Sequence, residues 1–363
     1  MASHTPRKDY RLVLAIALKD IGETLRNKNV LALVITTVLV TVLYRYLPLI
    51  RASQELPYVA IYDAGDSQLV PLLENSAVVE ARAYTSEERM LDRIRSGDLA
   101  ELGITVPEGF DDDLNNGRSA ALTAYALHWV ADEDLTDLVQ IAEGEIAIQL
   151  GVFVPIQVSD LRVFPSPDSG GMAVTLAMSL VYTVLMIGMM TTPQMMLEEK
   201  QTRTLDALLV SPASEIHVTL GKALAGLFYA LLGGAVGWAF FAHVVVHWWL
   251  AAAATLVWAL FAVALGLVLG TLLEVRQQLS LWGWVVIIPI LLPMMLYLLE
   301  DVMPDIVGRI AGWVPSSVVL DLVRAAAARP LTTADWAIPL VAAGAYATVA
   351  ITVQIIVMRR RAR

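Results

Sequence analysis

Long apolar runs dominate the pattern of hydrophobic and polar positions along the chain. Six stretches each have about 20 mainly apolar residues, the length that a helix needs to cross a bilayer. Strands and the helices of soluble proteins alternate apolar with polar positions, so runs of this length predict transmembrane helices. The predicted spans are 30–47, 172–193, 220–242, 249–273, 279–299 and 338–358. With its flanking residues, the first span occupies 30–50.

Lys and Arg residues predict how these spans are oriented. They gather before the first span, after the last, and in the segments that follow spans two and four, which include Lys200, Lys222 and Arg276. Short loops rich in Lys and Arg stay on the cytoplasmic side of a membrane. We therefore expect a multi-pass protein of the plasma (inner) membrane with both termini cytoplasmic and residues 51–168 extracytoplasmic.

The overall composition agrees with a membrane protein and excludes several kinds of site. The 363 residues are 57% hydrophobic and 17% charged, whereas soluble domains have about 25% charged residues. The chain has no cysteine. Disulfide scaffolds, thiolate metal sites and cysteine nucleophiles are therefore excluded.

Residues 51–168 have the composition of a folded domain exposed to water. They contain 7 Arg, no Lys and 22 acidic residues, a net charge of −15. Short β-rich runs predict strands at 58–62, 78–84, 102–106 and 120–127, with helices at about 85–95 and 132–151 between and after them. The predicted fold is an α-helical polytopic membrane protein with six transmembrane helices and an inserted α/β extracytoplasmic domain.

Two further segments are partly apolar. Residues 1–29 contain an amphipathic stretch, 8–25, that is suited to lying on the inner headgroups. Its predicted apolar face comprises Tyr10, Val13, Leu14, Ala17, Leu18, Ile21 and Leu25. Residues 301–335 predict a re-entrant outer segment with two short helices, 306–313 and 317–328, for which Asp305 and Ser316 are the expected caps.

The segment 194–219, between spans two and three, predicts a docking surface for a cytosolic partner. Leu205, Leu208 and Leu209 share one helical face, with charged residues on either side. A helix with a sparse apolar stripe suits docking, and an ordinary solvated loop is the alternative. Residues 169–363 thus hold spans two to six with this coupling segment and the re-entrant segment.

This segment resembles the coupling region of ABC-2 type transporter permeases. The resemblance lies in the run Thr204-Leu205-Asp206-Ala207-Leu208-Leu209-Val210-Ser211-Pro212, preceded by Glu198-Glu199 and followed by Gly221-Lys222. Two positions depart from the family pattern: Asp206 replaces the commoner Glu, and Arg203 replaces a frequent Gly. The residues that the resemblance assigns to ATPase coupling are Glu198, Glu199, Thr204, Leu205, Asp206, Leu208, Leu209, Ser211 and Pro212.

The resemblance also implies the partners. A P-loop requires Gly-x-x-x-x-Gly-Lys-Ser/Thr, and the only Gly-Lys pair, Gly221-Lys222, is followed by Ala223. We therefore expect no ATPase activity and no cofactor in this chain, with ATP and Mg²⁺ held by two copies of a separate cytosolic ABC ATPase. A second permease, identical or homologous, and membrane lipids are the other expected partners, and nucleic acid is not expected. The favoured cargo of such an exporter is a lipid, an amphipathic drug or a hydrophobic peptide.

Pathway residues are less sharply indicated. Thr175, Ser179, Tyr182 and Thr183 give span two a partly polar face, and Pro289 and Pro293 interrupt the backbone bonding of span five. Each set is typical of a cavity lining, and small polar residues are equally typical of helix–helix packing. No metal site is predicted, because His243 and His247 lack a third ligand nearby.

A receptor or membrane anchor that signals through its acidic outer domain is the alternative function. A transporter subunit should be encoded beside a P-loop ATPase, whereas a receptor or anchor need not be.

Overall fold

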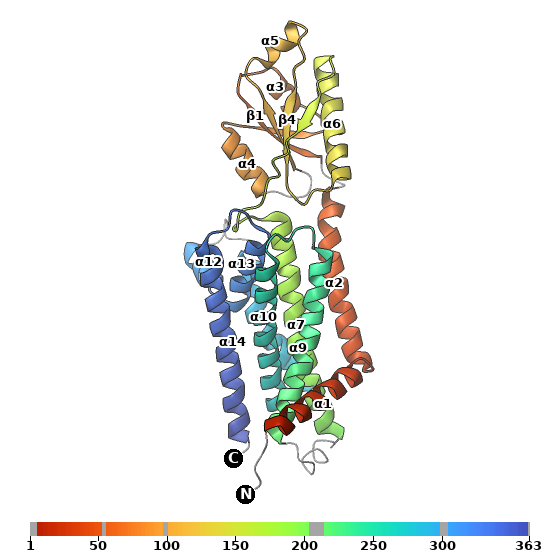
Figure 1. Ribbon diagram of the computed structural model, residues 1–363, viewed down its shortest axis with the longest axis vertical. Helices are drawn as coiled ribbons and strands as arrows, with labels where there is room; N and C mark the ends of the chain where they lie inside the picture. Colours follow the sequence, from red (N-terminus) through yellow and green to blue (C-terminus); the bar gives the residue numbers. More distant parts are fainter. Residues whose placement is uncertain (1–5, 53–55, 97–100, 203–213, 298–303, 362–363) are drawn as a thin grey trace.

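A bundle of long helices carries a small β-sheet domain at one end (Figure 1). The computed structural model describes residues 6–52, 56–96, 101–202, 214–297 and 304–361. Helix α1 (Pro6–Thr24) lies across the other end of the bundle, where both termini are also found. We call these the sheet end and the α1 end. The bundle helices are α2 (Lys28–Ala52), α7 (Gly171–Thr202), α9 (Glu215–Phe240), α10 (Trp248–Leu272), α11 (Arg276–Tyr297) and α14 (Thr333–Arg361).

Length and composition support a multi-pass membrane protein. Among the described residues, α7, α9, α10, α11 and α14 are long and apolar enough to cross a bilayer. The pair α12 (Asp305–Gly312) and α13 (Pro315–Ala327), bent by 76°, is a sixth candidate, either as a broken span or as a re-entrant loop. In α2 the described apolar stretch, Leu31–Tyr46, is shorter. The count of six spans, with α2 as the first, stays a prediction.

Helix α7 is the central helix of the bundle. It packs against α2, α9, α10, α11 and α13, and 89% of its most apolar window is buried. Small residues allow this close packing, because a Cβ on Gly188 would lie only 2.9 Å from Cβ of Ala262. The indole of Trp258 donates to the Val181 carbonyl across 2.8 Å, so its polar group is satisfied in the interior.

A five-stranded mixed sheet occupies the other end. Its strands are β1 (Tyr58–Asp63), β2 (Glu80–Tyr84), β3 (Glu101–Val106), β4 (Leu122–Ala126) and β5 (Ile156–Val158). In the order β2-β1-β3-β4-β5, only the β3–β4 pair is antiparallel. The accompanying helices are α3 (Leu69–Glu74), α4 (Glu87–Arg95), α5 (Phe110–Asn115) and α6 (Asp132–Leu150). The four predicted strands match observed ones within two residues at each end, whereas β5, α3 and α5 were not predicted.

Three local expectations are corrected by the structure. Helix α7 continues through Pro193 to Thr202, because its last turns are buried against other helices through Met195 and Leu197. The N-caps of α12 and α13 are Pro304 and Val314, so Asp305 and Ser316 are not caps. Pro315 occupies the first turn of α13, where its missing N–H costs nothing, and the Ser316 hydroxyl instead donates to the Ile290 carbonyl of α11.

Candidate functional site at the junction of α1, α7 and α9

Helix α1 has two different faces. Tyr10, Leu14 and Leu18 follow an i, i+4 spacing and are about half exposed or more, as expected of a helix on a membrane surface. An adjacent face, with Ala17 and Asp20, is buried against the bundle. Ala17 was expected on the lipid side, so this part of the prediction is wrong. Ala17 is buried because this face of α1 packs against α9.

Gly221 sets the point at which α1 crosses α9. A Cβ at this position would lie 2.5 Å from Cγ2 of Ile16 and 3.3 Å from the Val13 carbonyl oxygen. Only a residue without a side chain permits this approach. Two turns further along α9, the Tyr229 hydroxyl donates to the Ile21 carbonyl across 2.6 Å. Helix α1 is thus held against α9 at two points.

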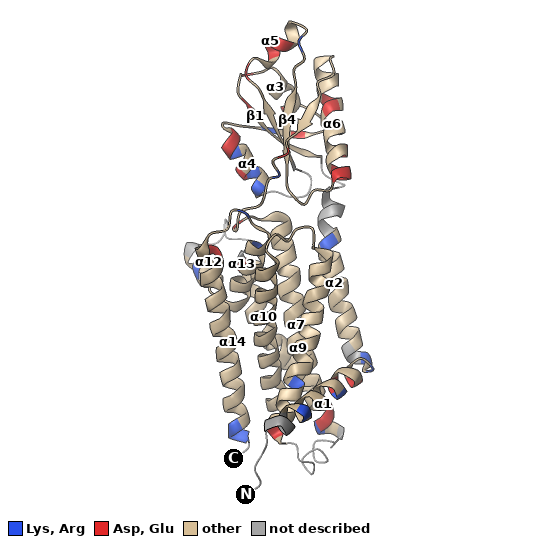
Figure 2. Ribbon diagram, viewed as in Figure 1, with Lys and Arg blue, Asp and Glu red and all other residues tan. Residues whose placement is uncertain are grey.

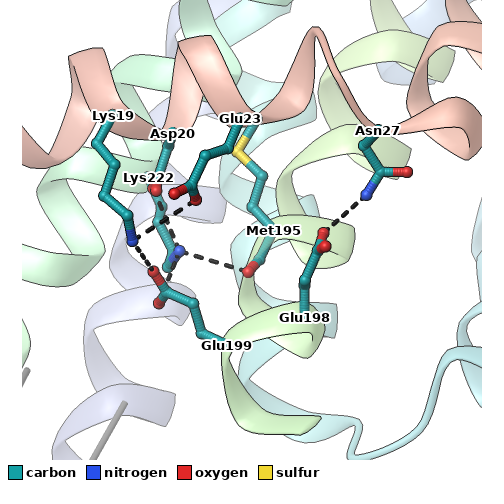
Figure 3. A network of polar contacts seen from close by, with 8 residues as sticks. All are labelled: Lys19, Asp20, Glu23, Asn27, Met195, Glu198, Glu199 and Lys222. Atoms are coloured by element: carbon teal, nitrogen blue, oxygen red, sulfur yellow. Dashed lines mark hydrogen bonds and ion pairs between the residues drawn. The ribbon is translucent and has the colours of Figure 1, made fainter. Parts of the chain in front are cut away.

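Lys222, directly after this glycine, joins three elements through a buried charge. Its side chain is 1% exposed. The ammonium nitrogen lies 2.8 Å from Oε2 of Glu199 on α7 and 3.2 Å from Oδ2 of Asp20 on α1. It also donates to the Met195 carbonyl across 3.4 Å (Figure 3). One lysine therefore connects α1, α7 and α9.

The charges in this cluster depend on one another. A buried ammonium is costly unless it is paired and hydrogen-bonded, and here two carboxylates and a carbonyl surround it. Burial raises the pKa of Asp20, the positive charge of Lys222 opposes this shift, and the Glu199 carboxylate adds to it. Lys19 lies 3.6 Å from both Glu199 and Glu23 and brings a second positive charge to the rim. Removing any central member would leave the others uncompensated.

A second polar contact involves the neighbouring Glu198. Its Oε2 accepts a hydrogen bond of 2.7 Å from the Asn27 amide, in the turn between α1 and α2. The same oxygen lies 3.3 Å from the guanidinium of Arg276 at the start of α11. Consecutive glutamates in the last two turns of α7 thus bind different helices, and Figure 2 shows the charged residues of the bundle gathered mainly at this end.

The cluster borders the predicted coupling segment. Helix α7 ends at Thr202, and α9 begins after Ser214, whose hydroxyl accepts the His217 amide as an N-cap. Glu198 and Glu199 are described. The other predicted coupling residues lie outside the described residues: Thr204, Leu205, Asp206, Leu208, Leu209, Ser211 and Pro212.

Residues 30–358 match the family model described as ABC-2 family transporter protein. The chain belongs to this family. It is therefore the membrane-spanning permease subunit of an ABC transporter, a family in which the ATPase normally resides on a separate partner subunit. No curated protein and no solved structure matches the chain significantly.

Sequence reasoning missed Asp20 as a member of the site. In this permease, Ile16, Ala17, Asp20 and Thr24 share the buried face of α1. The i, i+4 spacing of Ile16, Asp20 and Thr24 is visible in the sequence, and an acidic residue on that face is the signal that points to a buried cation. Lys222 itself was noted in the Gly-Lys pair, but a lysine at the end of a span is explained equally well as a membrane-orienting charge.

The predicted pathway residues lie on two helices of the permease. On α7, Ser179 and Thr183 are buried, and the Thr183 hydroxyl lies 2.8 Å from that of Thr41 on α2. Thr175 donates to the Gly171 carbonyl of its own helix across 3.1 Å, and Tyr182 is partly buried. In this conformation Thr183 takes part in helix–helix packing. Pro289 and Pro293 lie within α11, which continues through both.

Proposed function

We propose that this permease is one half of a dimeric exporter that two ATPase subunits drive from the α1 end. In this proposal α2 is the first of six spans, the α1 end is cytoplasmic and the sheet domain is extracytoplasmic. The distribution of Lys and Arg supports the orientation. The second permease is an identical or homologous chain. Apolar spans with few charges favour a lipid, an amphipathic drug or a hydrophobic peptide as cargo.

The buried Lys222 cluster is the observation that carries the coupling role. Residues 203–213 connect α7 to α9, and Lys222 holds the adjoining ends of both helices to α1 through Glu199 and Asp20. A displacement of this connection by the ATPase therefore acts on three helices joined as a unit. Because α7 also packs against α2, α10, α11 and α13, the displacement reaches the whole bundle.

The proposed docking residues are Leu205, Leu208 and Leu209, flanked by Glu198, Glu199, Thr204, Asp206, Ser211 and Pro212. An apolar stripe on a short segment supplies the contact area with a cytosolic partner. Closure of the two ATPases on ATP and Mg²⁺, which they hold, then supplies the motion. In this scheme the motion of the ATPases displaces the docking segment of the permease. The polar contacts of Glu198 and Glu199 transmit this displacement to the neighbouring helices.

Affinity purification of the full-length chain from its native membrane in mild detergent tests this function. We expect a P-loop ATPase to be recovered in stoichiometric amount. Replacement of Leu205, Leu208 and Leu209 by Ser should lower ATPase recovery and abolish coupling without unfolding the spans. A matched control replaces Ile148, Phe153 and Leu161 by Ser, because these are equally apolar and more than 60% exposed on the sheet domain.

Two outcomes would contradict the proposal. Unchanged ATPase recovery and transport in the triple-serine variant would exclude the docking role of the three leucines. Recovery of the wild-type chain without any ATPase, under conditions that preserve other ABC complexes, would exclude the coupled exporter and favour a receptor or anchor.

A further inference from the structure

An apolar groove runs along the outside of the bundle near the α1 end. Helices α9 and α14 both pack on α10, and the space between them has a volume of about 490 Å³. Leu220 and Leu224 contribute to the α9 side, Ile351 and Ile355 to the α14 side, and Val263 belongs to the floor. The groove is thus built from three helices, and it opens on the outer surface of the bundle, where Leu220, Leu224 and Ile355 are exposed.

The length of the groove matches one leaflet of a bilayer. Its lining residues on α9 extend from Ile216 to Leu227, about 17 Å at 1.5 Å per residue. Half of a hydrocarbon core of about 30 Å is about 15 Å. The groove begins near the first turn of α9 and the last turns of α14, so it lies in the half of the bundle nearest α1. An acyl chain of that leaflet fits along it.

Polar groups of two kinds lie at and below the mouth of this groove. Arg359 lines its outer end and is exposed, and no hydrogen bond or ion pair joins it to another residue of the described ranges. Gln354 lies about one turn deeper and is 5% exposed. Its amide nitrogen donates to the Thr271 hydroxyl across 3.2 Å, while its Oε1 has no partner among the described residues.

These groups are complementary to a glycerophospholipid. The guanidinium of Arg359 suits a phosphate at the membrane surface. The Gln354 amide lies deeper, at the level of the ester groups, and its nitrogen carries a second N–H besides the one that bonds to Thr271, a donor that suits an ester carbonyl. A cavity of about 250 Å³ adjoins the groove at Thr219 and Met358, and its lining includes Arg361. There is therefore room beside the mouth for a headgroup.

We infer that this groove binds one anionic glycerophospholipid, with an acyl chain between α9 and α14 and the phosphate at Arg359. Basic sites between transmembrane helices on the cytoplasmic side bind anionic headgroups. This lipid is a resident of the leaflet at the α1 end and not the cargo. The inference depends on the chain lying in a membrane with the α1 end on the cytoplasmic side, as proposed above, and does not depend on the coupling role of Lys222.

Lipid titration of the purified full-length chain, read by native mass spectrometry, tests the phosphate contact. The probes are phosphatidylglycerol and phosphatidylcholine with identical acyl chains. Arg359→Gln should weaken binding of phosphatidylglycerol about fivefold, the scale of one Arg near an anionic surface. Arg360→Gln is the matched control, because it removes the same charge one residue away, at a position that does not line the groove. It should leave binding within a factor of about two, which is roughly the error of such a titration.

A second pair of variants tests the groove itself. Ala223→Phe places a large side chain on the α9 side of the groove, whereas Ala252→Phe places it on an exposed position of α10 away from the groove. We expect the first to remove the bound lipid and the second to retain it. Thermal unfolding and gel filtration identify a variant that fails to fold, in which case the arginine pair decides.

Each contrary result overturns the inference. Equal losses in Arg359→Gln and Arg360→Gln would indicate general surface attraction only. Equal binding of the two lipids to the wild-type chain would exclude recognition of the anionic headgroup. Full binding to a folded Ala223→Phe variant would place the lipid elsewhere. All three measurements use the permease without its ATPase, so failure of the lipid site is distinguishable from failure of the proposed coupling.

Discussion

The two ends of the helix bundle are held together by different chemistry. At the α1 end, Lys222 makes ion pairs with Asp20 and Glu199, and all three side chains are buried. At the sheet end, the contacts between the sheet domain and the bundle use backbone carbonyls and rings. Paired charges have few alternative partners in an apolar interior, whereas carbonyls and rings accept many arrangements.

The contacts at the sheet end centre on His128. Its Nε2 donates to the Val244 carbonyl across 3.2 Å, and its ring stacks on Phe164 with centroids 4.6 Å apart. The Arg329 guanidinium lies 4.7 Å from the centre of the Phe164 ring, and the Arg329 amide donates to the Pro165 carbonyl. Backbone carbonyls and rings thus supply most of the partners here, and the charge comes from Arg329 and from the buried Arg324, whose guanidinium donates to the Ser169 carbonyl across 2.9 Å.

Because of this difference, the two ends should respond to different changes in side-chain charge and pH. The α1 end depends on keeping opposite charges together, so loss of one member should be costly and should separate α1 from α7 and α9. The sheet end depends on keeping one imidazole neutral, so it should respond to pH.

Lys222→Met should have the largest effect on stability. It leaves Asp20 and Glu199 buried without their cation, and breaking a buried pair costs about 3–5 kcal/mol. The measurement is thermal unfolding of the purified chain. Lys19→Met is the control, because its side chain is 44% exposed and its ion pairs should contribute less than about 1 kcal/mol. Equal shifts in the two variants would refute the distinction between buried and exposed pairs.

Acidification should weaken the sheet end. Burial lowers the pKa of His128 from 6.5 to about 4, against the opposing effect of its hydrogen bond to Val244. Between pH 6.5 and about pH 4 the unfolded chain therefore binds a proton at His128 that the folded chain does not bind. The folded state loses stability as the pH falls through this range. From pH 7 to pH 5 the loss should reach about 2 kcal/mol.

His128→Phe provides the comparison for this pH dependence. It keeps a ring against Phe164 and removes the titrating group, so the unfolding temperature should change less between pH 7 and pH 5 than in the wild-type chain. An identical pH dependence in both proteins would exclude His128 as its source.

Gly221→Ala should have the smallest effect of the three. The added Cβ would lie 2.5 Å from Cγ2 and 2.8 Å from Cβ of Ile16, closer than carbon atoms pack, so α1 must move away from α9. Overpacking of this kind costs about 1–3 kcal/mol, and the higher helix propensity of Ala offsets about 1 kcal/mol, which leaves a net loss of about 1 kcal/mol. Gly344→Ala on α14 is the control. No atom lies within 4 Å of its added Cβ, so it should be neutral or gain up to about 1 kcal/mol from helix propensity. A stabilised Gly221→Ala variant would show that α1 does not cross α9 here.

Local signals made much of the secondary structure predictable. Apolar runs located α9, α10, α11 and α14 within five residues at either end, because length and hydropathy are properties of a single segment. The end of α7 was missed, since Pro193 usually interrupts a helix and only burial of the turns beyond it compensates. The strand β5 was missed for a similar reason: three residues carry too little pattern, and pairing with β4 alone defines them.

The candidate site shows the same limit at the level of single residues. Glu198 and Glu199 were selected from the coupling motif, but nothing local distinguishes their partners. Glu198 contacts Asn27 and Arg276, whereas Glu199 contacts Lys222 and Lys19. Asp20 and Lys222 are 202 residues apart in sequence. Their pairing arises because Gly221 lets α1 approach α9, which is a property of the packed helices.

The sequence by itself therefore determined the class of this protein: apolar runs require a membrane, the coupling motif indicates the ABC-2 family, and the lack of a P-loop motif points to a separate ATPase. Tertiary structure alone decided which of several equally apolar helices is central. For α7, 89% of the apolar window is buried, against 22% for α11. Lipid tails and a protein interior are both apolar, so hydropathy cannot separate them, and only packing and the pairing of buried charges do.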